Sequence, residues 1–243
     1  LEQLLQHINA KGYGLTMGLH TRIDETIQTV ITHAEVGNLY INRNIVGAVV
    51  GVQPFGGEGL SGTGPKAGGP IYLYRLMQSC SAKKLAIPFA TQASKTQPVH
   101  QPLYEIFYTW AEKNFPQYKL SPSPAFCSGH HYELQGPTGE SNQYVVLPRK
   151  RVLSLADQEQ DQIQQLCAIF AVGSQPTVLA ENTFVLKYLQ KMPKEIANSF
   201  SIIQNIETDQ FDALLHLGTK VELQKLQSKI AARKGAIIGV TNL

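Results

Sequence analysis

The sequence predicts an α/β protein whose second half contains a parallel sheet. From about residue 157 onward, short apolar runs alternate with amphipathic segments, which is the pattern of strands joined by crossover helices. The first third contains the same kinds of element around a loop that holds many of the 20 glycines. With 243 residues and a 43% hydrophobic share, the chain can form one large or two small hydrophobic cores.

The beginning of the chain predicts a helix, a strand and a second helix. Apolar residues at helical spacing predict the first helix over residues 1–10, and glycines bound the strand at 15–20. The second helix, at 23–34, has Asp24 and Glu25 in its first turn, where carboxylates interact favourably with the helix dipole. Because a helical pattern begins at the first residue, with no leader-like segment before it, we expect the chain to be a piece of a longer polypeptide.

A glycine-rich loop comes next and is the most informative part of the sequence. Residues 38–42 alternate apolar and polar side chains, which predicts a short strand leading into the loop. Glycine has no Cβ and accepts positive φ, so the loop at 43–70 lets backbone amides approach a ligand closely. After the loop, residues 71–78 fit either a helix or a strand, and we favour a helix.

Residues 88–102 have the composition of a linker between folded units. They include three prolines and few large apolar side chains. We therefore expect a first domain at 1–87 and a second domain at 103–243.

The second domain carries the alternation that predicts the parallel sheet. It begins with an aromatic-rich helix at 103–115 and has strand-like segments between residues 143 and 155. At 157–170, apolar residues recur at the spacing of a helix with one buried face. The elements expected after this helix are, in chain order, a strand at 177–180, a helix at 183–190, a strand at 200–204, a brief helix near 209, a strand at 213–217, a helix at 221–233 and a strand at 236–241.

Two glycine motifs of the loop match nucleotide-binding patterns in letters but not in context. Gly57, Gly59 and Gly62 fit the dinucleotide motif G-x-G-x-x-G, which requires a helix immediately after the glycines. Residues 63–70 contain two prolines and three glycines and cannot open a regular helix, so we reject a dinucleotide site. Lys66 lacks the neighbouring glycine and hydroxyl residue of a phosphate-binding loop, and we expect it to be a solvated charge.

The cysteines and histidines offer no strong nucleophile or metal site. Cys167 falls on the buried face of a predicted helix, and Cys80 has no neighbour in sequence that would lower its pKa. Cys127, His130 and His131 form a single C-x-x-H-H without a second ligand pair, so we expect no bound metal. Three cysteines without close pairing favour a reducing compartment and hence the cytoplasm.

The charge balance argues against nucleic-acid and membrane binding. The formal net charge of +3 is too small to indicate either partner, and no apolar run reaches the roughly 18 residues that a spanning helix needs. A basic cluster at 149–151 is flanked by apolar residues, and we expect it on a solvated strand edge.

Part of the glycine-rich loop has the composition of a ligand-binding wall. Gly47 and Ala48 leave a small gap between valines, where main-chain amides could donate hydrogen bonds to a carboxylate. Phe55 could pack against the aliphatic part of the same ligand. The alternative is a tight glycine turn with a core phenylalanine, and composition alone favours that alternative.

A resemblance to a known family favours the ligand-binding wall over the tight turn. The run NLYINRNIVGAVVGVQPFGGEGLSGTGPKAGGP, with GLTMGLHTRIDETI before it, closely resembles the end of the catalytic domain in L-glutamate γ-semialdehyde dehydrogenases of the aldehyde dehydrogenase superfamily. The match covers residues 1–85 and is most similar to the bifunctional proline utilization A family. The resemblance implies that the amides of Gly47 and Ala48 anchor the α-carboxylate of the substrate and that Phe55 lines its aliphatic chain.

The resemblance also implies which parts of such an enzyme lie outside this chain. In the family, the catalytic cysteine, the oxyanion-hole asparagine, the NAD-binding unit and the flavin-binding proline dehydrogenase part are all upstream of the matched segment. We therefore expect no catalytic residue, cofactor site or metal site here, and no activity of this segment alone. The implied partners are NAD, FAD and glutamate semialdehyde in the longer protein, the upstream domains, and further copies in a homo-oligomer. Any peripheral membrane association would involve the proline dehydrogenase part alone.

Residues 103–243 resemble the accessory α/β domain of longer family members, which has a parallel, Rossmann-like sheet without a nucleotide site. No glycine-rich turn follows the predicted strands of this segment. In the family, such a domain is thought to help cover the active site and the tunnel that carries the intermediate. Two alternatives stay open: a non-catalytic lid or assembly domain only, and an NAD-binding protein that would rest on GEGLSG alone.

Overall fold

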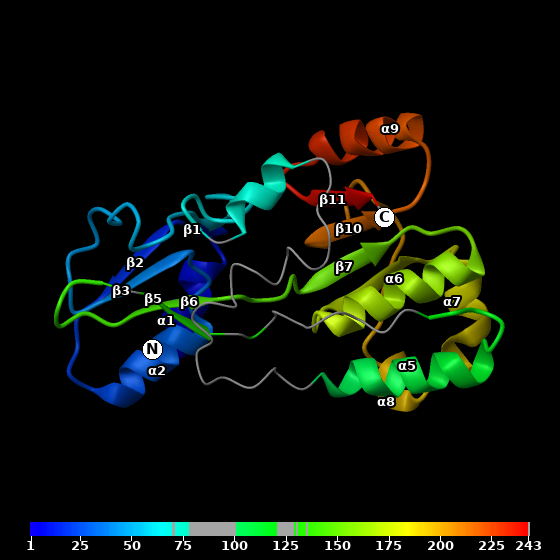
Figure 1. Cartoon of the computed structure of the whole chain (residues 1–243), viewed down its shortest axis with the longest axis horizontal. Helices are drawn as coiled ribbons and strands as arrows, with labels where there is room; N and C mark the ends of the chain where they lie inside the picture. The colour runs from blue at the N-terminus through cyan, green and yellow to red at the C-terminus, as the bar shows by residue number, and fades with distance from the viewer. Residues whose placement is uncertain (70, 78–100, 121–128, 130, 135, 243) are drawn as a thin grey trace. The chain divides into compact units, whose positions relative to one another are not determined.

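The structure is a computed structural model, and it describes residues 1–69, 71–77, 101–120, 129, 131–134 and 136–242 (Figure 1). Two compact units make up the chain. The first unit comprises Leu1–Ser94, Tyr132–Tyr144 and Lys234–Ile237, and the second comprises Lys95–His131, Val145–Arg233 and Ile238–Leu243. Most of the predicted linker at 88–102, together with Cys80, Cys127 and His130, lies outside the described residues.

The first unit is built from short helices and paired strands around the glycine-rich loop. Strands β2 (Thr16–Leu19) and β3 (Asn38–Ile41) pair in parallel, and the helix α2 (Asp24–His33) connects them. Strand β1 (Tyr13–Gly14) pairs antiparallel with β4 (Glu58–Gly59), which lies in the loop. The other elements are α1 (Glu2–Asn9), the 3-10 helix η1 (Tyr72–Leu76), and most of the strand pair formed by β5 (His131–Leu134) and β6 (Asn142–Val145).

The elements that the sequence predicted for the first unit are present. The two helices and two strands before the loop differ from their predicted boundaries by at most one residue at each end. The helix expected at 71–78 is a single 3-10 segment, η1, and not an α-helix. Two glycines and a proline precede it, and these residues have the poorest propensity for an α-helix.

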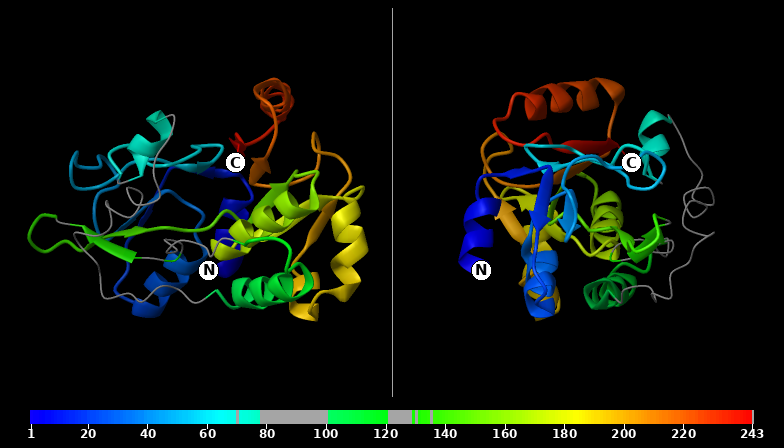
Figure 2. Two further views of the ribbon diagram at one scale, coloured as in Figure 1. Left: turned by 45° about the vertical axis from the view of Figure 1, so that its right-hand side comes forward. Right: turned by 90° about the vertical axis from the view of Figure 1, so that its left-hand side faces the viewer.

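The second unit contains a five-stranded parallel sheet (Figure 1 and Figure 2). The strands lie in the order β11-β10-β7-β8-β9, and every neighbouring pair is parallel. In chain order they are β7 (Arg151–Ser154), β8 (Gln175–Leu179), β9 (Ser201–Ile203), β10 (Ala213–His216) and β11 (Gly239–Asn242). The chain starts at the centre, proceeds to one edge and returns to fill the other, so the sheet is doubly wound. The predicted α/β class with a Rossmann-like sheet is therefore confirmed.

Helices cover both faces of this sheet. The helix α6 (Glu159–Ala171) packs on β7 and β8, and α5 (Pro102–Asn114) packs on the outside of α6. The helix α9 (Lys220–Ala231) lies on the opposite face (Figure 1). The remaining helical segments of this unit are α7 (Thr183–Tyr188), the 3-10 helix η2 (Leu189–Lys191) and α8 (Lys194–Ala197).

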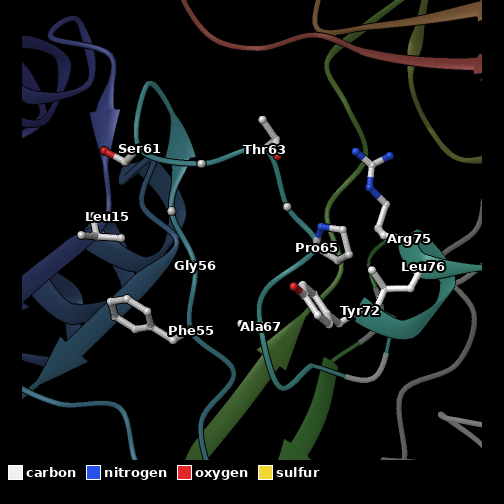
Figure 3. Close-up of a pocket in the computed structure, with 13 residues that line it drawn as sticks. Leu15, Phe55, Gly56, Ser61, Thr63, Pro65, Ala67, Tyr72, Arg75 and Leu76 are labelled. Carbon is white, nitrogen blue, oxygen red and sulfur yellow. The ribbon is translucent and has the colours of Figure 1, made fainter.

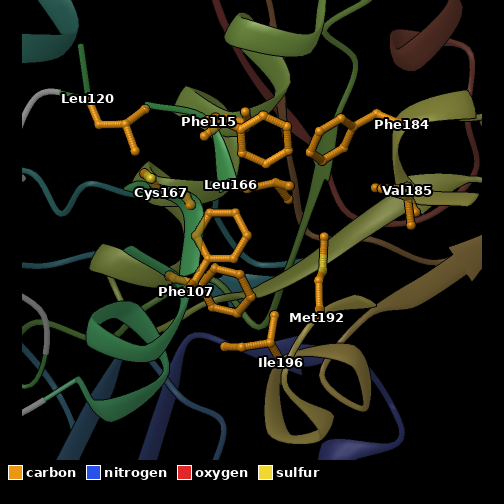
Figure 4. Packing of buried hydrophobic residues seen from close by; sticks show 13 residues of the cluster. Phe107, Phe115, Leu120, Leu166, Cys167, Phe184, Val185, Met192 and Ile196 are labelled. Carbon is orange, nitrogen blue, oxygen red and sulfur yellow. The ribbon is translucent and has the colours of Figure 1, made fainter. Parts of the chain in front are cut away.

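Two hydrophobic clusters hold the second unit together, one on each face of the sheet. The larger cluster joins α5 and α6 and is rich in aromatic rings (Figure 4). In it, the rings of Phe107 and Phe170 lie 5.0 Å apart and are tilted by 36°, a spacing at which aromatic rings attract each other. The smaller cluster joins Leu153 and Leu214 of the sheet to Ile230 of α9. Each helix layer is therefore fixed by its own apolar contacts.

Two predictions for the second unit are wrong. Residues near 209 form a turn, because the carboxylate of Asp209 accepts hydrogen bonds from the amides of Gln204 and Asn205 at 2.8 and 3.0 Å. The basic cluster at 149–151 does not mark a strand edge. Arg151 opens β7, which is the central strand, and its side chain lies 3.7 Å from the Asp212 carboxylate.

Candidate functional site

The two arms of the glycine-rich loop meet at an antiparallel bridge between Phe55 and Ala67. The Phe55 amide donates to the Ala67 carbonyl at 3.0 Å, and the Ala67 amide donates to the Phe55 carbonyl at 2.9 Å. Between them, Gly59 has a φ of 60°, and a Cβ at this position would collide with the Gly12 carbonyl oxygen. Glycine is therefore required where β4 pairs with β1. The segment that follows Gly62 does not open an α-helix, in keeping with the rejected dinucleotide motif.

Lys66 is not the solvated charge that its sequence context predicted. Its ammonium group donates a hydrogen bond to the Gly37 carbonyl and lies 5.9 Å from the centre of the Tyr144 ring. Burial lowers the pKa of Lys66, and the nearby Glu58 carboxylate opposes this shift. Lys66 therefore fastens the glycine-rich loop to the chain just before β3.

Phe55 lines a pocket of about 480 Å³ beside this bridge. Leu15 and Phe55 lie on one side of the pocket, and Tyr72, Arg75 and Leu76 of η1 lie on the other (Figure 3). Phe55 is 38% exposed, so its ring is not fully covered by the part of the chain that the structure describes. The pocket thus offers an apolar wall, backbone groups and one guanidinium, which suits a small ligand with an aliphatic part and a negative charge.

Gly47 and Ala48 lie in the loop after β3 and do not line this pocket. Gly47 has a φ of 82°, with open space where a Cβ would stand. The next amide, that of Val49, is already used, because it donates to Oε1 of Gln53 at 2.9 Å. By contrast, no hydrogen bond within residues 1–69 engages the amides of Gly47 and Ala48. Within residues 1–69, both amides are therefore without an acceptor.

Several residues around Phe55 were not identified from the sequence. The sequence places Tyr72 and Arg75 in a short helix but does not indicate that this helix lines a pocket together with the loop. Asn38 was assigned to a strand, but its side chain is buried and hydrogen-bonded to the backbone on either side of Phe55. A polar residue at an inward position of a short strand is the signal that could have pointed to Asn38, since buried amides are hydrogen-bonded.

The second unit has the strand order of a nucleotide-binding fold, but its residues do not fit a dinucleotide. In such a sheet the ligand binds where the order reverses, here at the carboxyl ends of β7 and β10. The first turn of α6 carries Glu159 and Asp161, whose charges repel phosphate. The Ala156 amide, just before α6, donates at 3.2 Å to Oε1 of Gln165, which also accepts from the Ser154 hydroxyl at 2.6 Å. An amide that such a turn would offer to a phosphate is thus already satisfied by the protein.

Two further candidate features, the thiol of Cys167 and metal-binding clusters, can be assessed within the described residues. Cys167 is buried among the aromatic residues, as predicted, and burial with the charge of Glu112 raises the pKa of its thiol to about 12. It is therefore protonated at neutral pH. Among the residues that the structure describes, no three His, Cys, Asp or Glu side chains are grouped so as to hold a metal ion. No helix within the described residues has the length and apolar character needed to cross a membrane.

The chain resembles known proteins both in its first third and along nearly its whole length. Residues 1–81 match the model of the aldehyde dehydrogenase family. Over 99% of its length, the chain is 45% identical to the bifunctional protein PutA of Klebsiella aerogenes, of which it covers 19%. The predicted resemblance is confirmed by these two matches. The chain spans about a fifth of the length of the curated relatives that match nearly all of it.

Two further comparisons concern about a third of the chain and the fold. Over 78 residues, or 32% of its length, the chain is 47% identical to the 1-pyrroline-5-carboxylate dehydrogenase of Bacillus subtilis (strain 168), covering 15% of that protein. The solved structure of proline utilization A from Corynebacterium freiburgense matches 100% of this chain and 22% of its own chain. Its TM-score is 0.50 and its sequence identity 18%, so this likeness concerns the fold alone.

Proposed function

We propose that this chain is part of a bifunctional enzyme that oxidises proline to glutamate, and that its first unit supplies the binding wall for glutamate semialdehyde. The similarity to PutA and to 1-pyrroline-5-carboxylate dehydrogenase supports this class of reaction and substrate. The observation that carries the proposal is Phe55, an exposed aromatic ring on the wall of a pocket, in the same loop segment as two available donor amides.

In this proposal the loop binds and orients the aldehyde but does not react with it. The amides of Gly47 and Ala48 donate to the α-carboxylate, while Phe55 covers the aliphatic chain that leads to the reacting carbon. The catalytic cysteine, NAD and FAD belong to other parts of the longer polypeptide, so the segment alone has no dehydrogenase activity. The longer protein is proposed to be a cytoplasmic homo-oligomer.

For the second unit we propose a non-catalytic covering or assembly role. The turn before α6 supports this role, because the Ala156 amide in it donates a hydrogen bond to Gln165 and the first turn of α6 is acidic. Two apolar clusters stabilise the fold of this unit. The proposed role is thus covering or assembly and not cofactor binding.

Substitution of Phe55 tests the aliphatic wall. In the full-length polypeptide, Phe55→Ala should raise KM for glutamate semialdehyde about tenfold, with kcat within about twofold, because the ring contacts the substrate equally before and during reaction. The measurement is the initial rate of NAD reduction. Leu60→Ala is the matched control, since Leu60 is a 45% exposed apolar residue of the same loop that does not line the pocket. An unchanged KM for Phe55→Ala would exclude the proposed wall.

Substitution of Ala48 tests the carboxylate anchor. Ala48→Pro removes one amide donor, so kcat/KM for glutamate semialdehyde should fall about tenfold or more. The kcat/KM for butanal, which has no carboxylate, should change by less than about twofold. Equal losses with both aldehydes would mean that the variant disturbs the site as a whole, and the anchor role would be rejected.

A further inference from the structure

The backbone around Phe55 is held at four consecutive hydrogen-bonding groups. The amide and carbonyl of Phe55 itself pair with Ala67. The groups on either side belong to Pro54 and Gly56, and both are bound by one side chain. Asn38 Nδ2 donates to the Pro54 carbonyl at 3.0 Å, and the Gly56 amide donates to Asn38 Oδ1 at 3.2 Å. The Asn38 carboxamide therefore binds the backbone on both sides of Phe55.

Asn38 is well placed to fix this segment because it is itself firmly held. It is the first residue of β3, it pairs with Thr16 of β2, and its amide donates to the Leu15 carbonyl at 3.1 Å. Only 8% of Asn38 is exposed. A carboxamide has a donor at one end and an acceptor at the other, so it can satisfy a carbonyl and an amide two residues apart at once.

The residue before Asn38 makes this contact possible. A Cβ at Gly37 would collide with the Gly56 carbonyl oxygen, so glycine lets β3 approach the loop closely enough for hydrogen bonds. The Gly37 carbonyl in turn accepts the hydrogen bond from the Lys66 ammonium group. Lys66 and Asn38 thus fasten opposite arms of the loop to the same short stretch of chain.

We propose that Asn38 is a positioning residue for the substrate wall: it sets the place of the Phe55 ring in the pocket by fixing the backbone on both sides. This inference rests on the proposed function of Phe55. Without the Asn38 carboxamide, the Pro54 carbonyl and the Gly56 amide lose their partner, while the Ala67 bridge and the Lys66 hydrogen bond remain. The loop then stays closed, but the ring is no longer held at one position.

A double-mutant cycle in the full-length polypeptide tests the inference. The variants are Asn38→Ala, Phe55→Ala and the two together, assayed by NAD reduction with glutamate semialdehyde. We expect Asn38→Ala to raise KM about fivefold or more with kcat within about twofold. In the Phe55→Ala background, the same substitution should change KM by less than about twofold, because the ring through which Asn38 acts is already absent.

Asn9→Ala is the matched control for the loss of a bridging carboxamide. Asn9 likewise donates to a carbonyl, that of His33 at 2.7 Å, and accepts from an amide, that of Glu35 at 3.1 Å, but it does not line the pocket. Its KM should equal that of the unsubstituted protein. If Asn38→Ala does not yield folded protein, as judged by its thermal melting curve, Asn38→Ser takes its place in the cycle.

The outcomes separate the two proposals. If Phe55→Ala raises KM and Asn38→Ala does not, the positioning role fails and the aliphatic wall stands. If the effects of Asn38→Ala and Phe55→Ala multiply in the double variant, Asn38 does not act through Phe55 and the positioning role also fails. If Phe55→Ala leaves KM unchanged, the proposed wall itself is wrong.

Discussion

Lys66 is a charged residue among glycines, yet its ammonium group lies between a carbonyl oxygen and an aromatic ring. Its local sequence offers no sign of this, because neither Gly37 nor Tyr144 is near it in the chain. The hydrogen bond and the ring recover only part of the hydration that the charge loses, and burial is the largest cause of its lowered pKa. The ammonium group nevertheless links the loop to the Gly37 carbonyl by its hydrogen bond.

The lowered pKa of Lys66 predicts how stability depends on pH. Between its folded pKa and its ordinary value of 10.5, the unfolded chain binds more protons than the folded one, so the contribution of Lys66 to the free energy of unfolding rises with pH. Lys66→Met has no such contribution. Urea unfolding at about pH 7 and about pH 10 should therefore show the stability difference moving in favour of the unsubstituted protein. Lys11→Met, at an exposed position, is the control, and matching pH profiles for the two variants would contradict the prediction.

The candidate site could be predicted from the sequence only in part, and the reason is visible at single residues. Gly47, Ala48 and Phe55 stand out because they match a family pattern within a glycine-rich loop. Their binding roles stay predictions. Asn38 and Lys66 do not stand out, because polar side chains near a loop normally face water. Their side-chain hydrogen bonds join residues 16 to 29 positions apart, and such contacts depend on the tertiary fold.

At the scale of elements, α6 is more buried than its own periodicity predicts. The apolar spacing indicates one buried face, yet Gln162 and Gln165 are each only 1% exposed. The helix lies between the sheet and α5, so both of its sides are covered. Nε2 of Gln162 donates to the Ser154 hydroxyl at 2.8 Å, and that hydroxyl donates to Oε1 of Gln165 at 2.6 Å. Nε2 of Gln165 has no partner among the described residues.

The aromatic contact between α5 and α6 should carry much of the stability of the second unit. Phe170→Ala removes a ring that is 1% exposed and packed on Phe107, so we expect the free energy of unfolding to fall by about 3–5 kcal/mol. Val172→Ala, two residues further on and 43% exposed, should change it by less than about 0.5 kcal/mol. Chemical denaturation followed by circular dichroism measures both. A loss for Phe170→Ala as small as that for Val172→Ala would show that this contact does not hold the helices together.

The sequence predicted the strands and most helices of the second unit because alternation of apolar runs is a local property. It predicted a helix near 209 wrongly, since the side chain of Asp209 binds backbone amides and so favours a turn. The four-residue helix α8 was missed because it is too short to show a periodic pattern. The spatial order of the strands was not predicted, and that order is what places β7 at the centre.

At the scale of the whole molecule, the linker at 88–102 stays a prediction from composition. The composition of the linker predicts that a protease cuts there first. Brief digestion with trypsin, followed by mass spectrometry of the intact fragments, should show an early cut after Lys95. The variant Lys95→Gln should lose this cut, while thermolysin still cleaves within the linker. First cuts inside β7 to β10 would contradict the linker prediction.

The strand order of the second unit also affects the tendency of the protein to aggregate through its sheet edges. The strand at one edge of the sheet, β9, is three residues long. An edge this short offers few free backbone groups to a strand from another molecule, which limits the gain from adding a strand. The longest strand, β8 with five residues, is enclosed between β7 and β9. Apolar substitutions that lengthen β9 would therefore favour aggregation of this unit through its edge strand.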